Sequence, residues 1–142
     1  MSVATKLGLT DPGRGLLAEA GEKWSRWCEE DPRLAVADGL LELQAWLLET
    51  VGPEAPQSAW DDADGVMHAL ARLASPRGGD DIAATAAVAY LLLPGASLLA
   101  NRLRGVAGQI DQLVAAQLWL EIRTFRWERL QKVAANILWN TR

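Results

Sequence analysis

Hydrophobic residues recur at helical spacing along most of the chain, most clearly between Gln109 and Arg142. The apolar positions of this stretch are Ile110, Leu113, Val114, Leu118, Leu130, Val133, Ala134, Ile137 and Leu138. They predict two amphipathic helices joined near Thr124–Trp127, with Leu118 and Ile137 facing each other or a shared core. No stretch alternates with a period of two over a useful length, so we expect no strand.

Helix-start and helix-stop residues divide the earlier part of the chain. Asp11-Pro12 and Asp31-Pro32 each place a capping carboxylate before a proline, which predicts a helix after each pair. The second of these helices is expected to stop at Gly52-Pro53. Ser58, with Asp61 three residues later, resembles a capping box and predicts a third helix.

Residues 75–79, Ser-Pro-Arg-Gly-Gly, separate this third helix from the most apolar segment of the chain. That segment runs from Ile82 to Ala100, nineteen residues without a charge, and we expect Asp80, or Asp81 one residue later, to cap it. Its length meets the criterion for a membrane span. Its alanine content and the Pro94-Gly95 pair favour a buried core helix instead, with a kink or a split at the proline.

Together these patterns predict an all-α single domain of about five to seven helices. Charge is uneven along its 142 residues: residues 1–80 hold 7 Lys and Arg against 14 Asp and Glu, and residues 81–142 hold 7 against 4. We therefore expect an acidic N-terminal helical part, residues 1–79, packed as one domain on a helical core, residues 80–142. Such a charge asymmetry can attract different partners to the two halves. The alternative is a solvated surface whose charge is simply uneven.

Candidate catalytic chemistry is sparse. The only histidine, His68, lies among apolar residues, and the only cysteine, Cys28, is followed by two glutamates that disfavour a reactive thiolate. The acidic trio Asp61, Asp62 and Asp64 fails the spacing of a calcium loop and is better explained as the charged first turn of a helix. We predict no enzyme, metal or cofactor. A lone cysteine and no secretory signal predict a cytoplasmic protein that does not span the membrane.

Seven tryptophans are many for this length. Five of them fall on predicted apolar faces and are expected in the core: Trp24, Trp27, Trp46, Trp60 and Trp119. The other two are interleaved with cations, a combination that can stack on unpaired bases while the cations meet phosphates. The predicted nucleic-acid-binding residues are Arg123, Arg126, Trp127, Arg129, Lys132, Trp139 and Arg142. In the alternative interpretation both rings close the core and the arginines cover them.

Two segments in the C-terminal half resemble a known family. Residues 113–121, LVAAQLWLE, and residues 133–137, VAANI, are similar to consecutive helices in the core helical domain of bacterial sigma factors of the extracytoplasmic-function type. Phrases such as LLPGASLLANRLR, QLWLEIRTF and VAANILWNTR look closer still to uncharacterised sigma-like proteins of actinobacteria.

This resemblance implies that the first helix docks on the clamp helices of RNA polymerase and that the second leads toward the element that traps flipped promoter bases. Candidate partner-binding residues on the first helix are Gln112, Gln117 and Glu121, although the family's polar docking positions are largely apolar here. The family's base-reading helix would continue beyond Arg142, so the chain is expected to be a fragment or a relative that has lost promoter reading.

Two functions follow from these observations. The leading prediction is a non-catalytic, transcription-associated protein that binds RNA polymerase, DNA or both. The alternative is a helical protein–protein adaptor without nucleic-acid binding, in which the acidic N-terminal helices hold the partner. Oligomeric state is not predicted.

Overall fold

The computed structural model describes residues 2–104, 109–127 and 132–141. The helices within these ranges are α1 (Val3–Leu7), α2 (Gly15–Glu30), the 3₁₀ helix η1 (Pro32–Val36), α3 (Leu40–Thr50), α4 (Gln57–Ala74), α5 (Ile82–Leu103), α6 (Ile110–Arg123) and α7 (Val133–Thr141). No strand occurs in the described residues. The predicted all-α class is confirmed, and the seven α-helices seen there match the upper end of the expected number.

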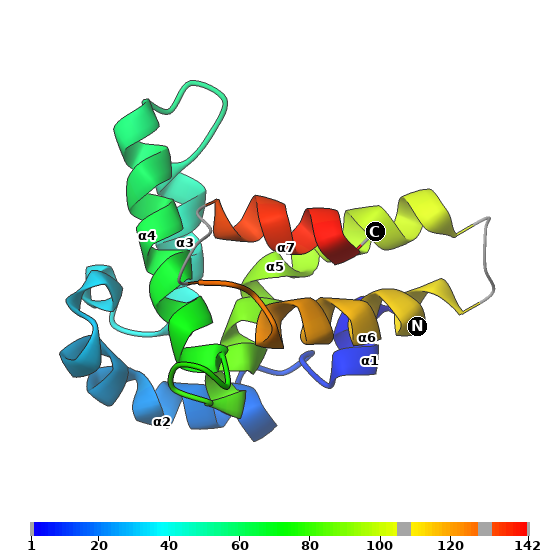
Figure 1. Ribbon diagram of the computed structural model, residues 1–142, viewed down its shortest axis with the longest axis horizontal. Coiled ribbons are helices and arrows are strands. Elements are labelled where there is room, and N and C mark those ends of the chain that lie inside the picture. Colours follow the sequence, from blue (N-terminus) through cyan, green and yellow to red (C-terminus); the bar gives the residue numbers. More distant parts are fainter. Residues whose placement is uncertain (1, 105–108, 128–131, 142) are drawn as a thin grey trace.

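Helix α5 forms the centre of the core and contacts α1, α2, α4, α6 and α7 (Figure 1). Its residues 83–89 are all buried, mostly alanines whose small side chains let neighbouring backbones approach closely. The helix is long and apolar enough to cross a bilayer, yet half of its most apolar window is buried among the other helices. It therefore serves as the core helix that its alanine content predicts.

Pro94 lies inside α5, which continues to Leu103, so the expected split at the proline is wrong. The axis of α5 changes direction along its length in Figure 1, the effect expected of an interior proline. The next residue, Gly95, allows α7 to lie against this part of α5. A Cβ added there would come within 2.6 Å of Leu138 Cδ1, closer than packed side chains allow.

The start of α5 is capped by Asp81, not by Asp80. Asp81 Oδ1 accepts hydrogen bonds from the backbone amides of Ala83 and Ala84, at 2.9 and 3.3 Å. Asp80 lies one residue earlier at a positive φ of 48°, within the turn that ends α4. The predicted break at residues 75–79 is confirmed, because α4 ends at Ala74.

Two of the other predicted helix starts are displaced. The Asp11 carboxylate accepts from the amide of Gly13, at 2.9 Å, and closes a local turn, so α2 begins only at Gly15. Asp31 does cap a helix, but the helix is the short η1; α3 starts separately at Leu40 after Gly39. An Asp-Pro pair favours a first turn, and tertiary packing decides whether an α-helix continues from it.

The capping box predicted at Ser58 is also wrong. Helix α4 starts two residues earlier than a cap at Ser58 would place it, at Gln57, and has no side-chain cap; Asp61 accepts a 2.9 Å hydrogen bond from Gln57 Nε2 instead. The acidic trio consequently lies beyond the first turn of α4, so its predicted place in a first turn is wrong.

The two C-terminal helices are α6 and α7, with the joint between them beginning at Thr124 as predicted. Leu118 and Ile137 are 0% and 1% exposed and belong to the same core, whereas Leu113 is 55% exposed. Leu130, another predicted apolar position, lies outside the described residues.

Candidate functional site

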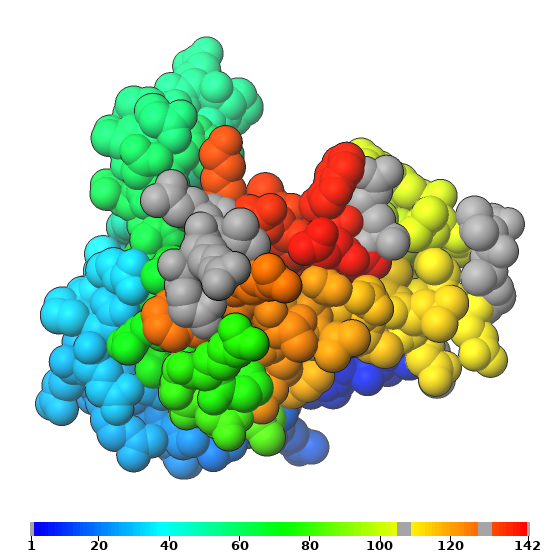
Figure 2. All heavy atoms as spheres, viewed as in Figure 1, coloured from blue at the N-terminus to red at the C-terminus, as the bar shows by residue number. Residues whose placement is uncertain are grey.

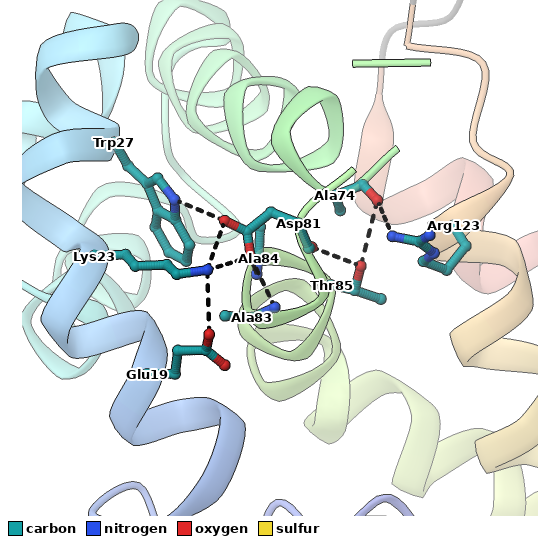
Figure 3. A network of polar contacts seen from close by, with 9 residues as sticks. All are labelled: Glu19, Lys23, Trp27, Ala74, Asp81, Ala83, Ala84, Thr85 and Arg123. Atoms are coloured by element: carbon teal, nitrogen blue, oxygen red, sulfur yellow. Dashed lines mark hydrogen bonds and ion pairs between the residues drawn. The ribbon is translucent and has the colours of Figure 1, made fainter. Parts of the chain in front are cut away.

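Arg123, the first of the predicted basic residues, is directed into the fold. Its Nη1 donates to the carbonyl of Ala74 at 2.8 Å (Figure 3). Its Nη2 lies 2.7 Å from Asp80 Oδ1. The guanidinium thereby ties the C-terminal end of α4 to α6, and only about a fifth of the side chain, 21%, is exposed. These contacts give Arg123 a structural role in the fold.

The same region carries a second set of polar contacts on the other side of Asp81 (Figure 3). Asp81 accepts from Trp27 Nε1 at 3.2 Å and pairs with Lys23 at 3.4 Å, which in turn lies 3.2 Å from Glu19. The hydrogen bond with Glu19 and the nearby Asp81 carboxylate raise the pKa of Lys23. These contacts join α2 to the start of α5. The polar side chains at this place on the surface thus have a structural role, and they do not indicate a catalytic site.

The remaining predicted nucleic-acid residues lie in different surroundings. Arg126 and Lys132 have exposed side chains, and Trp139 is 68% exposed. Trp127 packs against the core, where its Nε1–H meets no hydrogen-bond acceptor among the described residues, so the core interpretation fits this ring. Two further predicted residues, Arg129 and Arg142, lie outside the described ranges.

The candidate partner-binding residues lie along α6. Gln112 is exposed, while Gln117 donates from Nε2 to Glu121 Oε1 at 2.7 Å, one turn further along the same helix. Such a pair is a usual feature of a helix surface.

Four of the five tryptophans expected in the core are placed there. Trp24 and Trp27 are buried edge-to-face, with ring centroids 5.8 Å apart, and Trp46 and Trp119 are partly buried against the same core. Trp60 is the exception, because 46% of it is exposed. Trp60 lines a groove that the sequence pattern does not predict.

An open groove lies between α3, α4, α5 and α7, with a volume of about 510 Å³. Figure 2 shows the surface notched between the projecting α3–α4 pair (teal to green) and α7 (red). Most of the lining is apolar: Leu47, Val51, Trp60, Ala63, Met67, Leu91, Leu92, Ala134 and Ala135. Four polar residues complete it: Gln57, Asp61, Asp64 and Lys132.

The α7 wall of the groove is fixed by a cap that comes from a distant helix. Asp64, on α4, accepts from the backbone amides of Lys132 at 2.9 Å and Val133 at 2.6 Å. These amides open α7 and have no partner within that helix, so the Asp64 carboxylate acts as its N-terminal cap. A separation of 69 residues along the chain leaves no local pattern from which this role could be predicted.

His68, one turn further along α4, holds the chain before α7. One ring nitrogen, Nε2, lies 2.5 Å from the carbonyl oxygen of Trp127, and the other, Nδ1, lies 3.2 Å from Arg33 Nη1. A carbonyl only accepts and a guanidinium only donates, so Nε2 donates to Trp127 and Nδ1 accepts from Arg33 in these contacts. The imidazole also meets the Trp127 ring edge-on, at 6.1 Å between centroids. His68 is half-buried.

The α3 wall is unusually apolar for a helix at the surface. Of its leucines, Leu40 and Leu43 are buried, while Leu41 and Leu48 are 51% and 77% exposed. Trp46 and Leu47 are only partly covered. A helix with apolar side chains on several faces is typically covered on more than one side, whereas part of the apolar surface of α3 is exposed.

Reactive groups are few among the described residues. Burial, together with the nearby Asp38 carboxylate, raises the pKa of the Cys28 thiol, which keeps it protonated and unreactive at neutral pH. No group of three or more His, Cys, Asp or Glu side chains within the described ranges is arranged to hold a metal ion.

Comparison of the chain with protein-family models, with curated proteins and with solved structures finds no match in any of the three. The resemblance to sigma factors therefore stays a prediction.

Proposed function

We propose that this protein is a non-catalytic interaction module that receives an apolar helical segment of a partner protein in the groove between α3, α4, α5 and α7. The observation that carries the proposal is the groove itself, a mostly apolar depression of about 510 Å³ with a few polar side chains in its lining. Pockets that bind ligands commonly have volumes of roughly 300–1,000 Å³ and this distribution of polar and apolar groups.

A helical occupant is favoured because the walls of the groove are helices and one side is open. An amphipathic helix laid in such a groove buries its apolar face at i, i+3, i+4 and i+7 while its polar face stays in water. Each Å² of apolar surface removed from water contributes roughly 25 cal/mol.

The groove is also held in shape before any partner arrives. The Asp64 cap fixes the start of α7, and the His68 contact fixes the chain that precedes it. A preformed wall reduces the ordering cost of binding, so more of the contact free energy contributes to affinity.

The test uses a probe and two matched variants. Nile red, a neutral dye that fluoresces in apolar surroundings, is added to the protein, and a helical peptide of about 18 leucine, alanine and glutamine residues is titrated in as competitor. Ala135→Trp places a bulky side chain in the groove, whereas Ala116→Trp makes the same change at an exposed alanine of α6.

We expect the dye and the peptide to compete, and Ala135→Trp to abolish both signals while Ala116→Trp preserves them. If the wild-type protein binds neither probe, the proposal is wrong. It is also wrong if the tryptophan on α6 blocks binding and the one on α7 does not.

A transcription-associated, sigma-like protein is the second candidate, favoured by the exposed Arg126, Lys132 and Trp139. The internal contacts of Arg123 reduce the basic surface available to it. Each phosphate neutralised should steepen the log–log salt dependence of binding by about 0.7 on single-stranded and about 0.9 on duplex DNA. A salt titration comparing the chain with Arg126→Glu/Arg129→Glu tests this candidate. Equal, salt-independent signals for both proteins would exclude it.

A further inference from the structure

Two of the walls of the groove, α3 and α4, belong to the most acidic part of the chain. Residues 34–71, which form most of η1, all of α3 and most of α4, hold seven Asp and Glu and not one Lys or Arg. This stretch includes the α3–α4 pair that projects beside the groove in Figure 2. A surface of a single sign attracts ligands of the opposite sign and raises their rate of association.

The carboxylates are unevenly distributed around the groove. Asp61 lines it from α4, and exposed Asp62 lies next to it in sequence. Asp64 also lines the groove, but its two oxygens accept from the first amides of α7. On the α7 side the lining residue with a charge is Lys132, whose side chain is exposed. The α4 edge is therefore acidic and the α7 edge is basic.

Trp60 lies on the acidic edge, immediately before Asp61. The indole lines the groove and is 46% exposed, so one part of the ring is open to a ligand. Lysine and arginine side chains bind favourably over the face of a tryptophan, and a nearby carboxylate adds to the attraction. An exposed tryptophan beside a carboxylate thus provides a setting for a cationic side chain.

From this charge complementarity we infer that the partner segment is a basic amphipathic helix, with its apolar face in the groove and Lys or Arg residues along the α4 edge, over Trp60 and Asp61. The inference rests on the proposed function, since it names the chemistry of the segment that the groove receives. The opposite side of the segment, which meets Lys132, is neutral or acidic. This asymmetry fixes the direction in which the segment lies.

The experiment measures fluorescence anisotropy of three labelled helical peptides with one apolar face and with Lys, Gln or Glu along one edge. Binding to the full chain is compared at about 0.1 M and about 1 M salt, where the Debye length is about 10 and about 3 Å. Asp61→Asn removes one rim charge at an exposed position, and Glu42→Gln removes an exposed charge of α3 that does not line the groove. Ala135→Trp reports whether each peptide lies in the groove.

We expect the Lys-edged peptide to bind most tightly and the Glu-edged peptide most weakly, with a smaller difference at high salt. Exposed ion pairs alter affinity by about 1.5- to 5-fold, so Asp61→Asn should weaken the Lys-edged peptide by that factor and leave the Gln-edged one unchanged. Glu42→Gln should change the affinity of neither peptide by more than the loss of one net charge would.

The outcomes separate the inference from the function on which it rests. Equal binding of all three peptides, or tightest binding of the Glu-edged one, would overturn the inference and leave the groove's proposed function standing. Tight binding of the Lys-edged peptide that Ala135→Trp does not affect would place the contact outside the groove and also overturn it. Failure of all three peptides to bind would overturn the proposed function itself.

Discussion

Removal of the Asp64 carboxylate should destabilise α7, although Asp64 belongs to α4. The carboxylate accepts two amide hydrogens, from Lys132 at 2.9 Å and Val133 at 2.6 Å. In Asp64→Ala these amides lose their acceptor and must rely on water. Side-chain caps contribute about 0.5–2 kcal/mol, and a charged acceptor with two donors should be near the upper end.

Asp62→Ala is the matched control for this prediction. Asp62 is exposed on the same helix two residues earlier, so both substitutions remove one negative charge and bring the same gain in helix propensity. The difference between Asp64→Ala and Asp62→Ala therefore isolates the cap. In a chain of this length, each kcal/mol corresponds to a fall of about 2–4 °C in the melting midpoint.

Urea unfolding followed by circular dichroism gives the free energies, and hydrogen exchange shows where stability is lost. We expect faster exchange of the α7 amides in Asp64→Ala, with α2 amides less affected. Asp64→Asn, which keeps one acceptor oxygen without the charge, should lie between the wild type and Asp64→Ala. Equal stability of the Asp64→Ala and Asp62→Ala variants, within about 0.3 kcal/mol, would refute the assigned cap.

Three further predictions concern the core, the start of α5 and the response to acid. Leu118→Ala and Ile137→Ala should each lower the free energy of unfolding by about 2–5 kcal/mol, because both side chains are fully buried; a negligible loss in denaturation would contradict their placement. Asp81→Ala should lower the melting midpoint more than Asp80→Ala, since Asp81 caps α5 whereas the Asp80 side chain is 62% exposed in its ion pair; the reverse order would be inconsistent with the observed cap. Hydrogen bonds from the Arg33 guanidinium lower the pKa of Asp31 in the folded protein. The ionised Asp31 carboxylate therefore stabilises the fold at pH values above its unfolded-state pKa of about 3.9. This stabilisation is lost as the pH falls through the lower pKa of the folded state. Unfolding measured from neutral pH down to strong acid should show a shallower loss for Asp31→Asn, and parallel curves would show that the pair does not contribute.

The helical class and the main breaks could be predicted because they depend on local sequence. Apolar spacing marks α6 and α7, and the proline and glycines of residues 75–79 end α4. The alanine content of α5 indicates a core position, since small side chains suit close helix packing better than they suit a bilayer. Helix starts were less predictable. Asp31-Pro32 favours a first turn equally well whether an α-helix or the short η1 follows.

The candidate site could not be predicted because its residues come together only in the folded chain. Arg123 meets Asp80 across 43 residues, and Asp64 meets Val133 across 69, so neither pairing leaves a local pattern. Periodicity placed Trp60 on an apolar face, but it could not reveal that this face borders an open groove rather than another helix. The acidic trio is visible in the sequence, but the different roles of its members are not. Asp64 is a cap and Asp61 lies at the rim of the groove only because of where α7 lies.

The most direct test of the proposed function is a nuclear magnetic resonance titration of the isotope-labelled chain with the glutamine-edged helical peptide. Each tryptophan has its own indole N–H resonance, so the groove can be distinguished from the rest of the molecule. Binding in the groove predicts that the Trp60 indole and the described amides of α7 shift together, while the buried indoles of Trp24 and Trp27 stay in place. Shifts centred on Trp139 and the exposed face of α6, with Trp60 unchanged, would contradict it.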